Sequence, residues 1–180
     1  MIDAQGWLVN ARRVPSPNFN DRPHPKDISL LVIHNISLPP EQFGSDDICN
    51  FFTNCLDDSA HPYFEEIAEL HVSSHLLIDR QGNIIQFVSF DDRAWHAGQS
   101  CFDGVDNCNN YGIGIELEGA DEVPYTTFQY QALTEVTRAL LLRYPSIIKQ
   151  RIVGHSDISP SRKTDPGPAF DWQRYFSAIF

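Results

Sequence analysis

Apolar and polar residues alternate with a period of two between Tyr111 and Gly119, which is the pattern of a β-strand. One face of this strand carries the apolar residues Ile113, Ile115 and Leu117. The other face carries Gly112, Gly114, Glu116 and Glu118. Glycine beside glutamate indicates that another group closely approaches that second face.

Four further stretches have the patterns of strands. The apolar, branched run Ser29–Ile33 predicts a buried strand that ends at His34. The segments 72–78 and 84–88 flank the turn-forming sequence 79–83, which predicts an antiparallel hairpin. Residues 148–153 predict one more strand.

Helical spacing recurs in three other segments. The longest begins at Thr126 or Thr127, ends near Tyr144 before Pro145, and has an apolar stripe of Phe128, Leu133, Val136, Leu140 and Leu141. Ser45 is a predicted N-cap for a helix that contains Ile48, Phe51, Phe52, Cys55 and Leu56. A short C-terminal helix contains Trp172, Tyr175, Phe176 and Ile179.

Together these elements predict an α/β (α+β) fold, in which helices flank a central mixed β-sheet. The chain has 180 residues, of which 42% are hydrophobic, and this suits a single domain over 1–180 with one core. Residues 1–28 are rich in Pro, Asn, Asp and Arg, so we expect them to form an irregular lead-in that wraps the domain.

Charge and composition narrow the range of functions. The formal net charge of −11 disfavours nucleic acid and anionic membranes as partners. We see no export signal and no apolar run of about eighteen residues, so we expect a cytoplasmic protein that does not enter the membrane. No obligate protein partner is evident. We expect the four cysteines to be free thiols, with Cys101 and Cys108 as the alternative pair.

Three histidines, His34, His75 and His155, stand at the edges of apolar segments. Two such histidines and one carboxylate form a common catalytic zinc site with an open coordination position. We expect the loop over 154–170 to be irregular, and Asp165 is a plausible third ligand within it. Pro166 restricts the backbone of Asp165, and Gly167–Pro168 stiffens the turn that follows.

Glu116 and Lys163 complete the groups that one hydrolytic centre needs, namely metal ligands, a base and a cation. A structural alternative stays open for each residue. Histidines at strand edges are more often structural than ligands, and acids before proline usually form turns.

Four motifs together carry a resemblance to a known family: Leu31–Pro40, Arg93–Gly98, Gly112–Gly119 and Gly154–Trp172. They closely resemble the AmpD-type anhydro-N-acetylmuramyl-L-alanine amidases, over a likeness that runs from about Gly6 to Trp172. This family is related in fold to the peptidoglycan recognition proteins and phage amidases. The resemblance implies hydrolysis of the amide between the lactyl group of muramic acid and L-alanine, with a single zinc ion per chain.

The resemblance also implies roles for individual residues. His34, His155 and Asp165 would hold the zinc ion, Glu116 would be the catalytic carboxylate, and Lys163 would lie beside the substrate carbonyl. Glu118, on the same face as Glu116, is the alternative base. Asp157 is expected to hold the loop through hydrogen bonds to backbone amides rather than to bind metal.

The substrate-contacting residues follow the family less closely. Asn35 and Trp95 would line the cleft for sugar and peptide. The family has arginines near His71 and Asn107, where they would meet the carboxylates of the stem peptide, and neither residue here is a permanent cation. Arg93 or Arg151 can compensate for the missing charge.

The expected substrate is a small anhydro-muropeptide from cytosolic wall recycling, with an implied effect on β-lactamase induction. Two alternatives remain. One is a lytic amidase that acts on polymeric peptidoglycan. The other is a peptidoglycan-binding module without activity, but such a module would be expected to lack ligands that this sequence contains.

Overall fold

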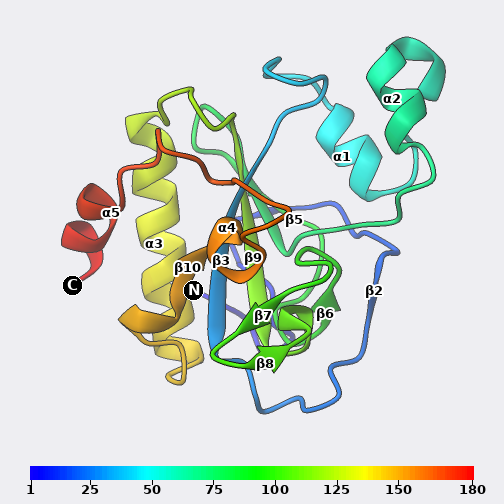
Figure 1. Ribbon diagram of the computed structural model, residues 1–180. Coiled ribbons are helices and arrows are strands. Elements are labelled where there is room, and N and C mark those ends of the chain that lie inside the picture. Colours follow the sequence, from blue (N-terminus) through cyan, green and yellow to red (C-terminus); the bar gives the residue numbers. More distant parts are fainter.

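A six-stranded mixed sheet forms the centre of the protein in the computed structural model, which describes residues 1–180 (Figure 1). From one edge to the other, the strands are β1 (Arg12–Arg13), β5 (Ile84–Gln86), β4 (Leu76–Ile78), β9 (Gly112–Glu118), β3 (Leu30–Ile36) and β10 (Ile152–Gly154). β4, β9, β3 and β10 run parallel, whereas β5 pairs with β4 in the predicted antiparallel hairpin. The mixed sheet and the flanking helices confirm the predicted fold class.

Shorter elements surround this sheet. The helices are α1 (Asp47–Phe52), α2 (Pro62–Ile67), α3 (Thr127–Arg143), α4 (His155–Ile158) and α5 (Trp172–Ile179). Three 3₁₀ turns span Asp58–Ala60, Cys108–Asn110 and Lys149–Arg151. Two small antiparallel sheets pair β2 (Phe19–Asn20) with β6 (Arg93–Ala94), and β7 (Cys101–Phe102) with β8 (Val105–Asp106). None of the helices has the length and apolarity needed to span a bilayer.

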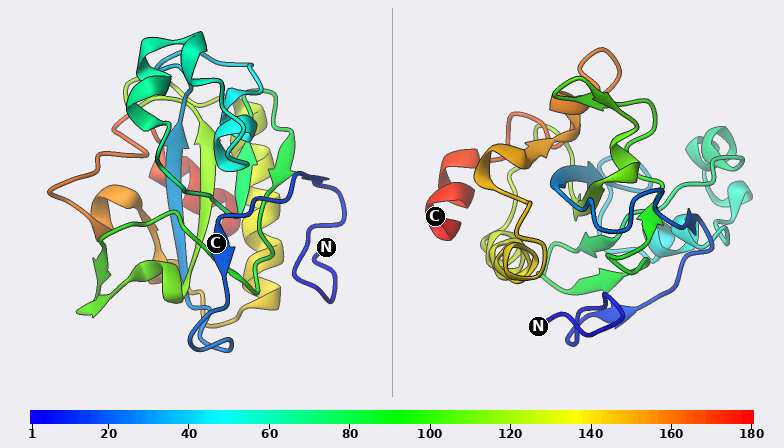
Figure 2. Two further views of the ribbon diagram at one scale, coloured as in Figure 1. Left: turned by 90° about the vertical axis from the view of Figure 1, so that its right-hand side faces the viewer. Right: turned by 90° about the horizontal axis from the view of Figure 1, so that it is seen from below.

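The sheet is covered on both faces (Figures 1 and 2). One face packs against α3, with α5 beside it, and the largest apolar cluster lies there. The other face carries two smaller clusters, one beneath α1 and α2 and one beneath residues 97–111 and α4. The central strands β3 and β9 are therefore buried on both sides, as expected for parallel strands.

The alternation in β9 is confirmed by this packing. Ile113, Ile115 and Leu117 belong to the cluster that faces α3. On the opposite face, the ring of His96 lies where a Cβ atom of Gly114 would be, so a larger residue does not fit there without displacing the ring. The close approach that glycine beside glutamate predicts is thus made by a histidine side chain.

Several predicted boundaries were wrong. β3 continues to Ile36, so His34 lies inside the strand rather than at its end. Asn54 has a left-handed φ of 60°, which ends α1 before Cys55 and Leu56. The predicted strand over 148–153 is shortened to β10, because the polar residues Lys149–Arg151 form a 3₁₀ turn.

Two segments predicted to be irregular contain regular structure. The 154–170 loop begins with one helical turn, α4. The lead-in over 1–28 contributes β1 to the edge of the main sheet and β2 to a small sheet. The long helix α3 is confirmed, and Thr126 and Gln129 form a capping box at its start. All four cysteines are free thiols.

Candidate active site

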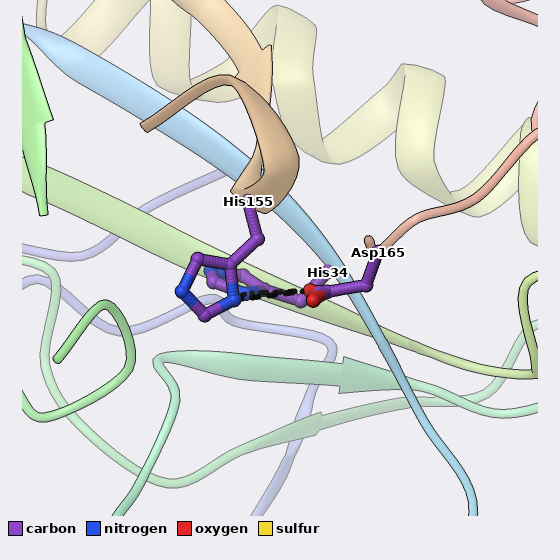
Figure 3. A group of neighbouring side chains, drawn as sticks. All are labelled: His34, His155 and Asp165. Carbon is purple, nitrogen blue, oxygen red and sulfur yellow. Dashed lines mark hydrogen bonds and ion pairs between the residues drawn. The ribbon is translucent and has the colours of Figure 1, made fainter. Parts of the chain in front are cut away.

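The carboxyl ends of two neighbouring parallel strands, β3 and β10, bring two of the predicted metal ligands together. Gly154, the last residue of β10, is in register with Ile33 of β3, so His155 follows directly beside His34. Asp165 returns from the loop after α4 and points at both histidines (Figure 3). Clefts at the carboxyl ends of parallel strands are common ligand sites, because the chain leaves the sheet there in loops.

Three ligand atoms form a small triangle. His34 Nδ1 lies 2.9 Å from His155 Nδ1 and 3.2 Å from Asp165 Oδ2, and His155 Nδ1 lies 3.1 Å from the same oxygen. Tetrahedral zinc with bonds of about 2.0–2.1 Å to nitrogen and oxygen separates its ligand atoms by about 3.3–3.4 Å. The three atoms therefore fit one face of a zinc coordination sphere with little movement, and they form a group that could hold a metal ion.

Hydrogen bonds fix which nitrogen of each ring faces this triangle. His155 Nε2 donates to the carbonyl of Ala97 at 3.1 Å, which leaves Nδ1 of the neutral ring with its lone pair. His34 is fully enclosed, and burial lowers the pKa of its imidazole to about 4. A neutral ring with a free lone pair is the form of histidine that binds metal.

Asp165 is ionised in this setting. Burial alone would raise the pKa of its carboxyl, but the hydrogen bonds with His155 and His34 outweigh burial and lower it. Its loop is fixed by neighbouring groups: Ser156 donates its amide to the Asp165 carbonyl, and Asn35 and Tyr125 both donate to the Pro166 carbonyl. A buried charged ligand is thus held in place before any ion arrives.

Asp157 holds the start of the same segment, as expected. Its Oδ2 accepts a hydrogen bond of 2.7 Å from the amide of Gly154. It is not one of the three residues grouped as potential metal ligands. Its carboxylate instead fixes the backbone turn from which His155 projects.

Glu116 lies beside this triangle because β3 and β9 pair in parallel, with His34 and Glu116 directly opposite each other. Its side chain is 8% exposed, and its Oε2 atom is buried without a hydrogen-bond partner. Burial, reinforced by the charge of Asp165, raises the pKa of Glu116 well above its usual value, whereas Lys163 opposes this shift. A carboxyl group with a raised pKa and a free oxygen is suited to proton transfer.

Glu118 has a structural role instead. Its two carboxylate oxygens accept hydrogen bonds from the amides of Gly44, at 2.5 Å, and Arg80, at 3.0 Å. It does not line the cavity that contains Glu116. The structure therefore argues against Glu118 as the alternative base.

A cavity of about 730 Å³ opens over these groups. Seven of the predicted site residues line it: Asn35, His71, Trp95, Glu116, His155, Lys163 and Asp165. His34 does not line the cavity, but its Nδ1 contacts His155 and Asp165, which do. Its opposite wall is apolar and comes from α1, α2 and nearby segments, chiefly Leu38, Phe51, Phe52, Tyr63, Ile67 and Val72. One side of the cavity is thus charged and polar, and the other offers apolar contact.

Asn107 does not belong to this group. It lines a separate cavity of about 470 Å³, and its left-handed φ of 59° places it in the tight turn after β8. Of the two possible compensating arginines, Arg93 lines the main cavity. Arg151 donates to Ser29, at the opposite end of β3 from the metal ligands. His75 is also outside the ligand triangle, and its Nδ1 accepts from the amide of Gly114.

Sequence reasoning missed several residues at the site. His96 lies within a quoted motif, beside Trp95, but no spacing marks it as a partner of His34. Arg162 lines the cavity and donates to the carbonyls of Ala97 and Gln99. The apolar wall was missed because α2 was not predicted, although Pro62 at a helix start and the spacing of Phe64 and Ile67 are signals for it.

The fold and site define a class, a hydrolase of mixed α/β architecture in which a buried carboxyl group with a raised pKa adjoins a group of potential metal ligands. The chain belongs to the N-acetylmuramoyl-L-alanine amidase family, whose model matches residues 24–168. It is therefore an amidase.

Several relatives are similar over nearly the whole chain. The 1,6-anhydro-N-acetylmuramyl-L-alanine amidase AmpD of Escherichia coli is 58% identical over 175 residues, covering 97% of this chain and 95% of that protein. A crystal structure of a selenomethionine derivative of AmpD has a TM-score of 0.97 at 54% identity, and covers 100% of this chain and 99% of its own. The E. coli amidase AmiD, in complex with the substrate anhydro-N-acetylmuramic acid-L-Ala-D-γ-Glu-L-Lys, has a TM-score of 0.62 at 28% identity, with coverages of 98% and 65%.

Proposed function

We propose that this amidase hydrolyses the bond between the lactyl group of 1,6-anhydro-N-acetylmuramic acid and the L-alanine of the stem peptide, with one zinc ion per chain. The observation that carries the proposal is the triangle of His34, His155 and Asp165 beside the unpartnered carboxyl of Glu116. Support for the substrate comes from the similarity to AmpD proteins over 97% of this chain.

The donor set suits zinc. Two neutral imidazole nitrogens and one carboxylate oxygen are typical of catalytic zinc sites that keep a position for water. When bound, the ion would supply Lewis acidity toward a water molecule and the substrate carbonyl. His34, His155 and Asp165 would hold it, and their rings and loop are already fixed by hydrogen bonds.

Glu116 carries the proton in this proposal. Its free Oε2 accepts a proton from the attacking water as the water oxygen bonds to the carbonyl carbon. When the carbon–nitrogen bond breaks, the same carboxyl returns that proton to the nitrogen of L-alanine. The products are the lactyl carboxylate of the sugar and a peptide with a free amine.

Lys163 and the cavity walls complete the reaction site. The cation of Lys163, which already acts on the pKa of Glu116, stabilises negative charge that develops on the amide oxygen. Trp95 offers an aromatic face to the sugar. The side-chain amide of Asn35 donates hydrogen bonds to Asp121 and to the carbonyl of Pro166, which leaves its oxygen as an acceptor for a substrate donor.

The biological role we infer is the recycling of muropeptides in the cytoplasm, with the associated effect on β-lactamase induction. The alternative substrate is polymeric peptidoglycan, which contains the same scissile amide. A cavity of about 730 Å³ with an apolar wall favours a small substrate, because it encloses a ligand on several sides.

Two measurements test the proposal. The first compares turnover of an anhydro-muramyl tripeptide with that of the reducing muramyl tripeptide and of purified sacculi, and we expect the anhydro compound to be preferred. A preference for sacculi would refute the proposed substrate and the compartment. The second is the zinc content of the purified chain, for which less than about half an equivalent, with full activity in chelator, would refute the metal site.

A further inference from the structure

We propose that His96 is a positioning residue, which fixes the ring of His34 in the one tautomer that can bind the metal. This inference rests on the proposed zinc site and concerns a side chain that lies behind a ligand. It follows from three sets of contacts on the face of β9 that carries Gly114.

The first contact joins the two rings. His34 Nε2 lies 3.0 Å from His96 Nδ1, and the ring planes are nearly perpendicular at 84°. Both side chains are buried, so solvent does not compete for this interaction. Between two neutral imidazoles, a hydrogen bond at this distance requires a proton on one of the two facing nitrogens.

The ligand triangle decides which nitrogen carries that proton. His34 Nδ1 faces His155 and Asp165, so it must keep its lone pair if the ring is to bind a metal ion. The proton of His34 then lies on Nε2, which donates to His96 Nδ1. Metal-binding histidines usually donate a hydrogen bond from their second ring nitrogen to a carboxylate, a carbonyl or water. Here the acceptor is another imidazole.

The other ring nitrogen of His96, Nε2, makes no hydrogen bond. With Nδ1 as the acceptor, the proton of His96 lies on Nε2, and that atom is buried without a partner. An unsatisfied buried donor destabilises a fold, and a side chain kept only for packing would not require one. Either tautomer of His96 leaves this nitrogen unpartnered, so the buried imidazole is retained at a cost that its contact with His34 explains.

The backbone next to His96 helps to orient the other histidine of the triangle, His155. Asn109 Oδ1 accepts from the amides of His96, at 3.1 Å, and Ala97, at 2.8 Å, which fixes both residues. The carbonyl of Ala97 in turn accepts from His155 Nε2. Two consecutive residues, one by its side chain and one by its backbone, thus orient both imidazole ligands.

Zinc affinity of His96 variants tests this role. His96→Leu removes the acceptor, whereas His96→Asn keeps an oxygen close to the position of Nδ1. We expect His96→Leu to bind zinc about 10–100-fold more weakly in competition with a chelator, and His96→Asn to recover most of that loss. The control is His75→Asn, which alters another buried histidine that touches His96 but no ligand, and it should leave the affinity unchanged.

Three results would overturn the inference. The first is a zinc affinity of His96→Leu within about twofold of that of the unmodified chain, well short of the expected loss. The others are equal losses of affinity in His96→Leu and His96→Asn, or a loss in His75→Asn as large as in His96→Leu. An unmodified chain that binds no zinc would instead refute the proposed function. The two failures are therefore distinguishable.

Nuclear magnetic resonance of the unmodified, zinc-loaded protein gives a second readout if His96→Leu does not fold. We expect a ¹⁵N–¹⁵N coupling across the hydrogen bond between His34 and His96, with the proton on His34 Nε2. A proton on His96 Nδ1 would refute the proposal, because His34 would then be the acceptor.

Discussion

Replacement of Glu116 by Gln tests the proposed proton transfer separately from metal binding. The substitution keeps the shape of the side chain, and Oε2 makes no hydrogen bond that could be lost. It removes the proposed acid–base group. Because the proposed zinc ligands are His34, His155 and Asp165, zinc content should not change.

The size of the expected loss follows from the surroundings of Glu116. General acid–base catalysis typically contributes about 10²–10⁴-fold. Asp165, the other carboxylate that lines the cavity, is occupied by two histidines, and both oxygens of Glu118 accept backbone amides. Since neither can replace Glu116, we expect the upper part of that range, about 10³–10⁴-fold in kcat.

The same substitution should lower activity but raise the stability of the metal-free fold. Burial raises the pKa of Glu116, so its contribution to the stability of the metal-free fold is greatest at acidic pH and is lost as pH rises through that raised value. Glutamine does not ionise. The metal-free Glu116→Gln protein should therefore resist denaturant better than the unmodified protein at pH 8, and this advantage should shrink toward about pH 4, near the unfolded pKa of glutamate.

The assay combines turnover of the anhydro-muramyl tripeptide, zinc analysis and denaturant titration at the two pH values. A variant that retains zinc and loses less than about tenfold in kcat, well below the expected range, would show that Glu116 is not the acid–base group. Loss of zinc from the variant would contradict the assignment of the three ligands.

Three further predictions concern the neighbouring residues. Lys163→Ala should lower kcat by about 10²–10³-fold at constant zinc content, whereas an effect on KM alone would assign Lys163 to substrate binding. Gly114→Ala should lower the free energy of unfolding by about 1–3 kcal/mol, because its Cβ meets the ring of His96; an unchanged denaturation midpoint would refute this packing. Arg93→Gln should raise KM for the stem peptide but not for a substrate with its carboxylates amidated, and equal effects on both would exclude a carboxylate contact.

The predictable parts of this molecule are those governed by local pattern. Alternation predicted β9 and its two faces, and apolar spacing with the stop at Pro145 predicted α3, because both depend on neighbours in the sequence. The grouping of His34, His155 and Asp165 was also predicted, although there the long family motifs supplied what spacing left open.

The parts that escaped prediction depend on contacts between distant segments. β1 and β2 are two-residue strands whose partners lie more than 70 residues away, and no local signal marks them. His96 pairs with His34 across 62 residues, through a contact that exists only once Gly114 has left room for its ring. Asn107 was assigned to the cleft by family position, but the turn after β8 carries it into another cavity.

The parallel register of β3 and β9 affects which parts of the site can open to solvent without unfolding of the whole domain. His34 and Glu116 lie on the two central strands, so their amide hydrogens should exchange with solvent only when the whole domain unfolds. His155 and Asp165 lie on a single helical turn and a loop, which can open separately. If the proposed zinc ion is bound, its release is expected to be a local event that leaves His34 and Glu116 in place, so that reloading is faster than refolding.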